Sequence, residues 1–369
     1  SGIAGDLHVF GQGLRSCTEL HELNLNFHGS GINGDLQVLS QSIRFCTQLR
    51  ILDLSFKKSD VCGDLHVLGE SLRSSKKLQK LQLNFDDSKV TGDLHDLGQS
   101  ISSCTQLQKL QLHFKRDFQS ENGISGDLHD LGKSLRSCAQ LQMIEFNFDY
   151  TDITGSLHDV GKSISSCPQL QTLQLHFKRE WRSGNEIIGD LNDLVLSLRG
   201  CTQLQKLELD FERNEIAGDL HDLGQSLRSC TQLQRLKLDF YKNNITGDLH
   251  ELGQSIGGCT KLQKLWLDFK ENNITGDLHE LGQSIGSCTK LQELTLLFKD
   301  NKVTGDLHEL GQSVGRCTLL QELRLSFGNG TINGDLHQLG QSIGRCTQLQ
   351  TLMLFFEKNN ISGDLHELG

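Results

Sequence analysis

The chain has little proline, tryptophan or tyrosine: one proline, Pro168, and only two tryptophans and two tyrosines among 369 residues. A single proline excludes a proline-rich linker between domains. No apolar run approaches the ~18 residues that a membrane-spanning helix needs, so we expect no membrane insertion. The formal net charge of -10 argues against nucleic acid as the main partner, because phosphate binding requires a basic surface.

Signatures of catalysis and of cofactor binding are also missing. There is no Cys-x-x-Cys pair for zinc and no phosphate-binding loop. No nucleophile with its own base stands apart from the rest of the sequence, because each recurring His, Asp or Ser belongs to a repeated pattern. We therefore expect these residues to have no enzyme activity and to bind no cofactor and no metal.

Repetition is the dominant feature of the sequence. A Gly-Asp-Leu-His signature, with small variations, begins at Gly5, Gly34, Gly63, Gly92, Gly126, Gly155, Gly189, Gly218, Gly247, Gly276, Gly305, Gly334 and Gly363. The spacing is 29 residues, except for two intervals of 34, and a fixed period in this range is typical of a solenoid. We expect residues 1–369 to form one continuous solenoid of about twelve repeats, in which each repeat buries its apolar face on its neighbours.

The first half of each repeat predicts a helix, as the repeat that begins at Thr246 shows. Apolar residues recur at the helical steps of three, four and three at Leu249, Leu252, Ile256 and Cys259. Thr246 is expected to cap this helix and Asp248 to lie in its first turn. Gly253 lies inside the helix, where glycine is unfavourable, and its recurrence suggests close packing against a neighbouring coil.

The second half of the same repeat predicts a strand. Leu265, Leu267 and Phe269 alternate with polar residues, as in a half-buried strand, and residues 269–274 turn the chain back towards the next helix. Parallel strands lie ~4.8 Å apart, whereas packed helices need ~8–10 Å. The stack should therefore bend into a curved horseshoe or superhelix, with a concave strand face and a convex helical face.

These motifs resemble the leucine-rich repeat (LRR) family, in which Leu-x-x-Leu-x-Leu is followed by Asn-x-Ile. The 29-residue length resembles the ribonuclease-inhibitor-like class, and the Cys-Thr-x-Leu-x-x-Leu-x-Leu rhythm is similar to long repeats of ciliate protists. The resemblance implies an α/β, right-handed solenoid. A recurring phenylalanine extends each strand, and the asparagine position becomes Ser59, Ser88 or Thr151 in early repeats. We expect a phenylalanine spine to replace part of the usual asparagine ladder.

Cysteine and histidine each recur at one repeat position. Eleven of the twelve cysteines do so, and Cys62 is the exception. A helix-side spacing of ~8–10 Å is too wide for disulfides, which need Cα atoms ~4.4–6.8 Å apart. We predict buried free thiols, which favour an intracellular site. Eleven of the fifteen histidines share a position in the first helical turn, where isolated, solvated surface residues are expected.

The repeated histidines also suggest an alternative hypothesis, pH-dependent association. Protonation below the reference pKa of ~6.5 would carry the net charge of -10 to neutrality and past it. A second group of motifs bears on the compartment, because Asn-x-Ser/Thr matches the N-glycosylation acceptor pattern and permits an extracellular site. The asparagines concerned are Asn244, Asn273, Asn329 and Asn360. The sequence therefore leaves the localisation unknown.

The two longer repeats carry related insertions that could bind a partner. Each insertion places basic groups beside an aromatic residue, a combination favoured at interface hot spots. Insertions on one face of a solenoid often mark a binding face, although surface loops also accept extensions at little cost. The candidate residues in these insertions are Lys115, Arg116, Phe118, Lys178, Arg179, Trp181 and Arg182.

The concave strand face is a second candidate surface. Its aspartates should stack on adjacent strands, beside a parallel column of Lys206, Arg235 and Lys264, and two aromatic residues lie nearby. The candidate residues are Asp210, Asp239, Tyr241, Trp266 and Asp268. The charges form either a ligand-binding patch or self-compensating columns, and surface charge pairs of the second kind are common and weak.

Neither end of the sequence carries an atypical capping repeat, which solenoids normally have. We expect either a longer chain or open ends that stack on other molecules. The first functional hypothesis is a non-catalytic structural or assembly element that stacks head to tail, because the repeats are nearly uniform. One alternative is an LRR module that recognises a protein through its concave face or the insertions. Another is a regulatory array for an enzyme whose catalytic domain lies outside these residues.

Overall fold

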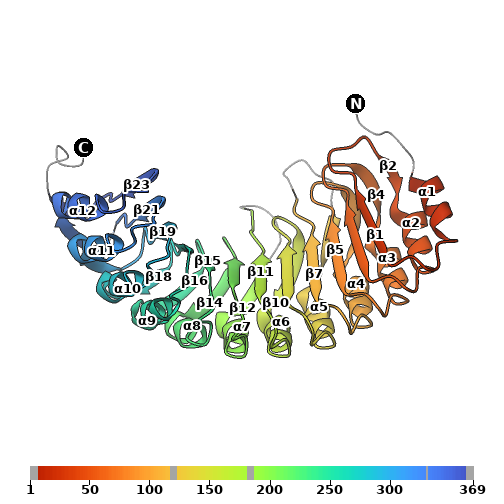
Figure 1. The fold of residues 1–369 in the computed structure, drawn as a ribbon, viewed down its shortest axis with the longest axis horizontal. Coiled ribbons are helices and arrows are strands. Elements are labelled where there is room, and N and C mark those ends of the chain that lie inside the picture. Colours follow the sequence, from red (N-terminus) through yellow and green to blue (C-terminus); the bar gives the residue numbers. More distant parts are fainter. Residues whose placement is uncertain (1–6, 117–122, 181–186, 330, 363–369) are drawn as a thin grey trace. The chain divides into compact units, whose positions relative to one another are not determined.

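The computed structural model describes residues 7–116, 123–180, 187–329 and 331–362. The chain divides into two compact units, 1–188 and 189–369, which we call unit 1 and unit 2 and describe separately. In each unit the helices form one layer and the strands of the main sheet another (Figure 1). Whether the chain forms one continuous solenoid stays a prediction.

Unit 1 repeats a strand, a second short strand and a helix. Its helices are α1 (Leu7–Leu14), α2 (Leu36–Ile43), α3 (Leu65–Leu72), α4 (Leu94–Ile101), α5 (Leu128–Leu135) and α6 (Leu157–Ile164). Its main parallel sheet contains β1 (Glu22–Asn26), β3 (Ile51–Ser55), β5 (Lys80–Asn84), β7 (Lys109–His113), β9 (Met143–Asn147) and β11 (Thr172–His176). Its second sheet contains β2 (Asn33–Asp35), β4 (Asp60–Asp64), β6 (Lys89–Asp93), β8 (Gly123–Asp127), β10 (Asp152–Ser156) and the start of β12 (Ile187–Asp190).

Unit 2 repeats the same elements. Its helices are α7 (Leu191–Leu198), α8 (Leu220–Leu227), α9 (His250–Gly258), α10 (Leu278–Ile285), α11 (Leu307–Val314) and α12 (Leu336–Ile343). Its main parallel sheet contains β13 (Lys206–Asp210), β15 (Arg235–Asp239), β17 (Lys264–Asp268), β19 (Glu293–Leu297), β21 (Glu322–Ser326) and β23 (Thr351–Phe355). Its short strands are β14 (Glu215–Asp219), β16 (Asn244–Asp248), β18 (Asn273–Thr275), β20 (Thr304–Asp306), β22 (Thr331–Asp335) and β24 (Asn360–Ser362).

The repeat length sets the register of the main sheets. Each residue pairs with the residue at the same repeat position in the next strand, so Leu207 faces Leu236 and Leu236 faces Leu265. The longer interval does not disturb this register, because Leu110 of β7 still pairs with Ile144 of β9. The additional residues therefore lie outside the paired strands, and both main sheets keep their leucines in the core.

The second sheet was not predicted from the sequence, which indicated only a turn between each main strand and the next helix. In β16, buried Ile245 alternates with exposed Asn244 and Thr246. Such a short alternation is too weak to predict a strand. Because equivalent segments of successive coils lie side by side, their backbone N–H and C=O groups bond to one another, and β14, β16 and β18 pair in parallel.

The helix cap is the aspartate of the signature and not the residue two positions before it. Asp64 has an extended backbone, and its carboxylate accepts a hydrogen bond from the His66 N–H at 2.7 Å. Thr246, expected as a cap, lies in β16, and its hydroxyl donates to the Gly218 carbonyl. Asp248 precedes α9 and does not lie in its first turn; it accepts from His250 N–H. Gly63, with φ +127, supplies the left-handed conformation that places the aspartate before its helix.

The phenylalanine spine is confirmed in both units. Neighbouring rings stack with centroids 5.7 Å apart between Phe56 and Phe85 and 5.8 Å apart between Phe240 and Phe269. In unit 2 an asparagine ladder accompanies the spine, since Asn272 donates to the Phe240 carbonyl of the preceding coil. In unit 1 the shorter Ser59 donates to the Phe56 carbonyl of its own coil. The phenylalanine stack therefore continues through both units, whereas the side-chain hydrogen bond next to it stays within one coil at Ser59 and reaches the preceding coil at Asn272.

The predicted row of buried thiols is present, with one exception. All cysteines are free, and within the row only Cys17 is exposed; Cys62, outside the row, is exposed as well. The buried thiols contact carbonyls of the preceding coil, as Cys288 Sγ does with Ile256 O at 3.4 Å. Burial raises the pKa of the Cys104 thiol to about 12, so these thiols pack as apolar groups. The described helices are too short and too polar to traverse a lipid bilayer.

Candidate binding surface

The outward side of the main sheet in unit 2, which we call the sheet face, carries residues that vary from strand to strand. Leu207, Leu209 and their equivalents point into the core, so the alternate positions point outwards. Helices α10 and α11 differ at one residue, Ile285 against Val314. Outward residues change in every strand: Arg-Lys-Asp in β15, Lys-Trp-Asp in β17, Glu-Thr-Leu in β19 and Glu-Arg-Ser in β21.

The aspartates predicted to stack are brought together. Asp210 pairs with Asp239 and Asp239 with Asp268 on successive strands, and all three are at least 95% buried. Lys237 Nζ lies 2.6 Å from Asp210 and 4.0 Å from Asp239. Lys270 Nζ lies 3.0 Å from Asp268. Burial raises the pKa of Asp268, although the neighbouring ammonium opposes this shift.

The predicted lysine and arginine column compensates other carboxylates. Lys206 and Arg235 each lie 3.3 Å from Glu208, and Lys264 pairs with Glu293. The self-compensating arrangement expected from the sequence is therefore present, but the cations that compensate the aspartates are Lys237 and Lys270.

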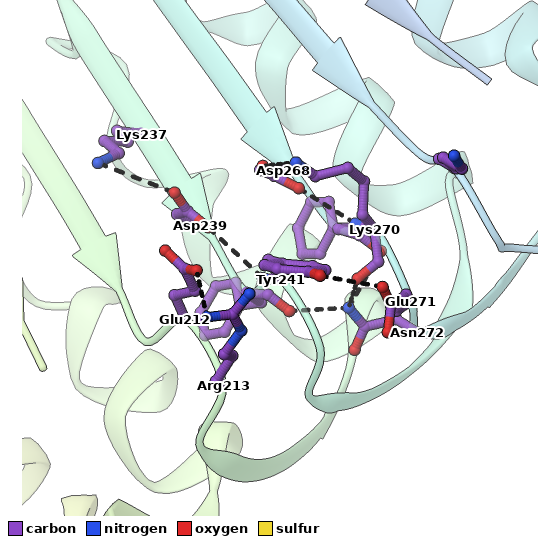
Figure 2. A network of polar contacts seen from close by, with 12 residues as sticks. Glu212, Arg213, Lys237, Asp239, Tyr241, Asp268, Lys270, Glu271 and Asn272 are labelled. Atoms are coloured by element: carbon purple, nitrogen blue, oxygen red, sulfur yellow. Dashed lines mark hydrogen bonds and ion pairs between the residues drawn. The ribbon is translucent and has the colours of Figure 1, made fainter. Parts of the chain in front are cut away.

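Tyr241 lies where the chain leaves β15, between two cations (Figure 2). The Arg213 guanidinium is 5.2 Å from the ring centroid and the Lys270 ammonium 4.9 Å. The phenol hydroxyl donates to Glu271 at 3.0 Å. Cations on the face of an aromatic ring are stabilising and hold the ring in place.

Trp266 occupies the middle of the sheet face. Lys237 and Arg324 approach its ring to 5.8 and 5.9 Å from the centroid. Its neighbour on β19 is Thr295, which is buried. The indole Nε1 is buried and has no hydrogen-bond partner among the residues that the structure describes. A large aromatic residue held between cations is typical of interface hot spots.

Sequence reasoning named Tyr241 and Trp266 but did not single out Arg213, Lys270 or Arg324. A signal was present, since Arg324 has the same repeat position as Trp266 two strands away. The sequence does not reveal which cation reaches which ring, because this depends on side-chain direction across neighbouring strands.

The insertions belong to unit 1, and only their first residues are described. Lys115 and Arg116 follow β7, and Lys178 and Arg179 follow β11, with β9 between the two strands. Phe118, Trp181 and Arg182 lie outside the described residues.

The first residues of both insertions are held in the same way. The backbone N–H of Lys115 donates to Asp86 Oδ1 at 2.8 Å, and that of Lys178 donates to Asp149 Oδ1 at 2.9 Å. The Lys115 ammonium lies 5.8 Å from the ring centroid of Tyr150. The two insertions therefore start in equivalent conformations, as their related sequences imply. Their role in binding stays a prediction.

The glycosylation motifs lie in two structural settings. Asn244, Asn273 and Asn360 are exposed and begin β16, β18 and β24. In these motifs the Thr or Ser hydroxyl donates to a glycine carbonyl of the preceding coil, as Thr275 does to Gly247 at 3.2 Å. Asn329 has φ +60 and bonds to Asp300. Glycosylation of these residues stays a prediction.

No family model matches the chain, and no curated protein is similar to it in sequence. Among solved structures, a plant ice-binding protein has 17% identity and a TM-score of 0.54, and the alignment covers 86% of this chain and 85% of that protein. The plant peptide hormone receptor RGFR1 in complex with RGF2 has 21% identity and a TM-score of 0.44, with 98% of this chain aligned. This chain spans 66% of that receptor structure, slightly under two thirds.

An LRR protein of Leptospira interrogans has 17% identity and a TM-score of 0.43, with 98% of this chain and 95% of that protein covered. At these identities the likeness concerns the fold alone. The in-register parallel strands, the helices that follow them and the stacked leucine core define the class of fold: each unit has the fold of a leucine-rich repeat solenoid.

Proposed function

We propose that this chain is a non-catalytic recognition module that binds a protein partner through the sheet face of unit 2. The observation that carries this proposal is the contrast between the two sides of the repeat. Helices α10 and α11 are almost identical, whereas the outward residues of β15, β17, β19 and β21 differ from strand to strand. A lattice requires equal contacts at each repeat, while recognition of one partner requires unequal contacts.

The aromatic residues of the sheet face support the same conclusion. The chain has only two tryptophans, and Trp266 lies among Lys237, Arg324 and buried Thr295. Tryptophan and tyrosine contribute large contact areas at a low cost in conformational entropy. We therefore place the energetic centre of the interface at Trp266, with Tyr241 at its edge.

The test is selection of a random peptide display library on the immobilised chain, followed by measurement of the affinity of the enriched peptides. The Trp266→Ala variant should bind these peptides about thirtyfold more weakly, the effect of losing a hot spot worth about 2 kcal/mol. Gln111→Ala is the matched control, because Gln111 occupies the same middle strand position in β7 of unit 1. Equal binding to the wild type and to Trp266→Ala would overturn the proposal, provided that both unfold at the same denaturant concentration.

Assembly remains a second candidate function, and the uniform helical side favours it. In α8, α9 and α10 the same contact recurs, a glutamine amide on the histidine Nε2 four residues earlier. Identical exposed groups at a fixed spacing suit contacts between copies of a chain. Head-to-tail stacking and a regulatory role for an enzyme outside these residues stay hypotheses, as does the closer likeness to the ribonuclease-inhibitor-like class and to ciliate repeats.

A further inference from the structure

We infer that the partner segment recognised by the sheet face of unit 2 is an acidic, extended polypeptide. This inference rests on the proposed function and adds the chemistry of the partner. It follows from how deeply the two kinds of charge are buried on this face, where the carboxylates lie below the cations. The composition of the strands, in which the two charges are balanced, does not show this layering.

The carboxylates of β13, β15 and β17 form the lower layer of the face. The side chains of Glu208 and Asp268 are 10% and 6% exposed, and Asp210 is fully buried. The cations that pair with them are the outer layer: Arg235 is 39% exposed and Lys270 30%. Lys206 and Lys237, at 28% and 24%, belong to the same outer layer. A partner that approaches this part of the face therefore meets positive charge first.

The buried carboxylates hold these cations in place. Asp210 fixes Lys237 at 2.6 Å, and Glu208 fixes both Lys206 and Arg235 at 3.3 Å. Long basic side chains normally lose rotamer freedom when they bind a partner, and this loss costs affinity. Side chains that are already fixed lose less. A basic partner would have to displace these cations to reach the carboxylates beneath them, and like charges placed against each other are strongly unfavourable.

The cationic part of the face has clear borders. On β19 and β21, Glu293 and Glu322 are 41% and 28% exposed, so carboxylates reach the surface there. At the loop edge, Glu212 and Glu271 are 22% and 40% exposed beside their cations. The region suited to acidic groups is therefore the outer side of β13, β15 and β17, and Trp266 stands at its border.

The geometry of the sheet suits an extended segment that crosses the strands. The cations at the first strand position, Lys206, Arg235 and Lys264, lie on successive strands, which are ~4.8 Å apart. In an extended peptide, side chains on one side recur every ~7 Å. Long lysine and arginine side chains can span this difference, so alternate carboxylates of the partner can each pair with a cation. The chain as a whole carries a charge of -10, so its net charge would repel such a partner and this local surface must supply the attraction.

The experiment measures binding of short polyglutamate, polylysine and Gly-Ser peptides of equal length to the full chain by fluorescence anisotropy. We expect polyglutamate alone to bind, with an affinity that falls as salt rises. The Arg235→Gln/Lys264→Gln double variant should weaken this binding about tenfold, because two outer cations are lost. Lys80→Gln is the matched control, since Lys80 has the same strand position in β5 of unit 1, and it should leave binding unchanged.

The outcomes separate this inference from the proposed function. If polylysine binds as well as polyglutamate, or if the double variant binds polyglutamate like the wild type, the acidic partner is wrong. Library peptides that depend on Trp266 but carry no acidic residues would also overturn this inference, while the proposed recognition function would stand. If no peptide depends on Trp266, the proposed function itself fails.

Discussion

At the scale of single residues, the glycine in the middle of several helices lies close against the backbone of the next helix. A Cβ built on Gly224 would lie 2.5 Å from the carbonyl carbon of Glu251 in the following helix. At Gly253 the nearest atom would be the Leu281 backbone, at 3.1 Å. The close packing that the sequence suggested is therefore confirmed. The close approach accounts for a residue that is otherwise unfavourable inside a helix.

This contact predicts the effect of a single methyl group. Gly224→Ala should lower the free energy of unfolding by about 1–3 kcal/mol, since the added carbon meets backbone that cannot move aside. Gly258→Ala is the control, because a Cβ there would lie more than 4 Å from every atom beyond its chain neighbours and the backbone of its own helix, and it should be neutral or slightly stabilising. Urea titration of both variants checks the prediction, and equal midpoints would contradict it.

At the scale of elements, the repeated histidines join successive helices. Most are exposed, as expected, whereas His158, His279 and His308 are half-buried, and several are paired with a carboxylate. His66 Nδ1 lies 2.7 Å from Asp96 in the next helix, and His95 Nδ1 lies 2.6 Å from Asp130; in unit 2, His279 pairs with Glu309. The sequence expectation of separate solvated rungs was wrong because partners about 30 residues apart meet only when the coils stack.

These pairs make the stability of the helical side depend on pH. The hydrogen bond to Asp96 and the charge of that carboxylate raise the pKa of His66, with further contributions from Glu70 and Asp64. Asp130 acts in the same way on the pKa of His95, and Glu309 on that of His279. A pKa raised in the folded state gives stability that is fully present below the unfolded value of ~6.5 and is lost as pH rises through the folded value.

The corresponding test replaces His66, His95 and His279 by glutamine. We expect this triple variant to melt below the wild type at pH ~5.5, and the difference in melting temperature to become smaller as pH rises towards ~9, well above the reference histidine pKa of ~6.5. His21→Gln, an exposed histidine outside these pairs, should melt like the wild type at both values. A difference in melting temperature that is constant with pH, or larger at high pH, would contradict the stabilising role of the histidine–carboxylate pairs. The hypothesis of pH-dependent association stays a prediction.

At the scale of the whole molecule, the cysteines of the two units differ in whether their thiols are exposed to solvent. Cys17 and Cys62 are exposed, and the other cysteines are buried. Burial raises the pKa of Cys138, Cys259 and Cys317 to about 12, so these thiols are not ionised at neutral pH and react slowly with electrophiles.

Thiol titration checks this distribution. The native chain should react rapidly at two thiols, Cys17 and Cys62, and all twelve should react after denaturation. The Cys17→Ser/Cys62→Ser variant should show no rapid phase in the native state. Rapid reaction of further cysteines would show that the coils open, and fewer than twelve thiols after denaturation would reveal disulfides that the structure does not contain.

The sequence predicted which residues of the candidate surface lie in one row. It did not predict their burial or the cations that pair with them. The constant repeat places Asp210, Asp239 and Asp268 in one row, because identical spacing forces identical register. Only the structure shows that these carboxylates are buried and that Lys237 and Lys270 cover them. Burial of a strand residue depends on the side chains of the two neighbouring strands, which lie a full repeat away in the sequence.

The sequence by itself determined the repeat, the helix and main strand of each coil, the leucine core, the phenylalanine spine and most of the thiol row. These features follow from short-range periodicity, which local sequence carries. The tertiary structure decided the second sheet, the aspartate caps, the histidine pairs between helices and the outward layer of cations over buried carboxylates. The second sheet, the histidine pairs and the contact of Lys237 with Asp210 join successive coils, so they exist only after the coils have stacked. The aspartate cap is a local contact, and only the backbone conformation of the folded chain shows which residue makes it.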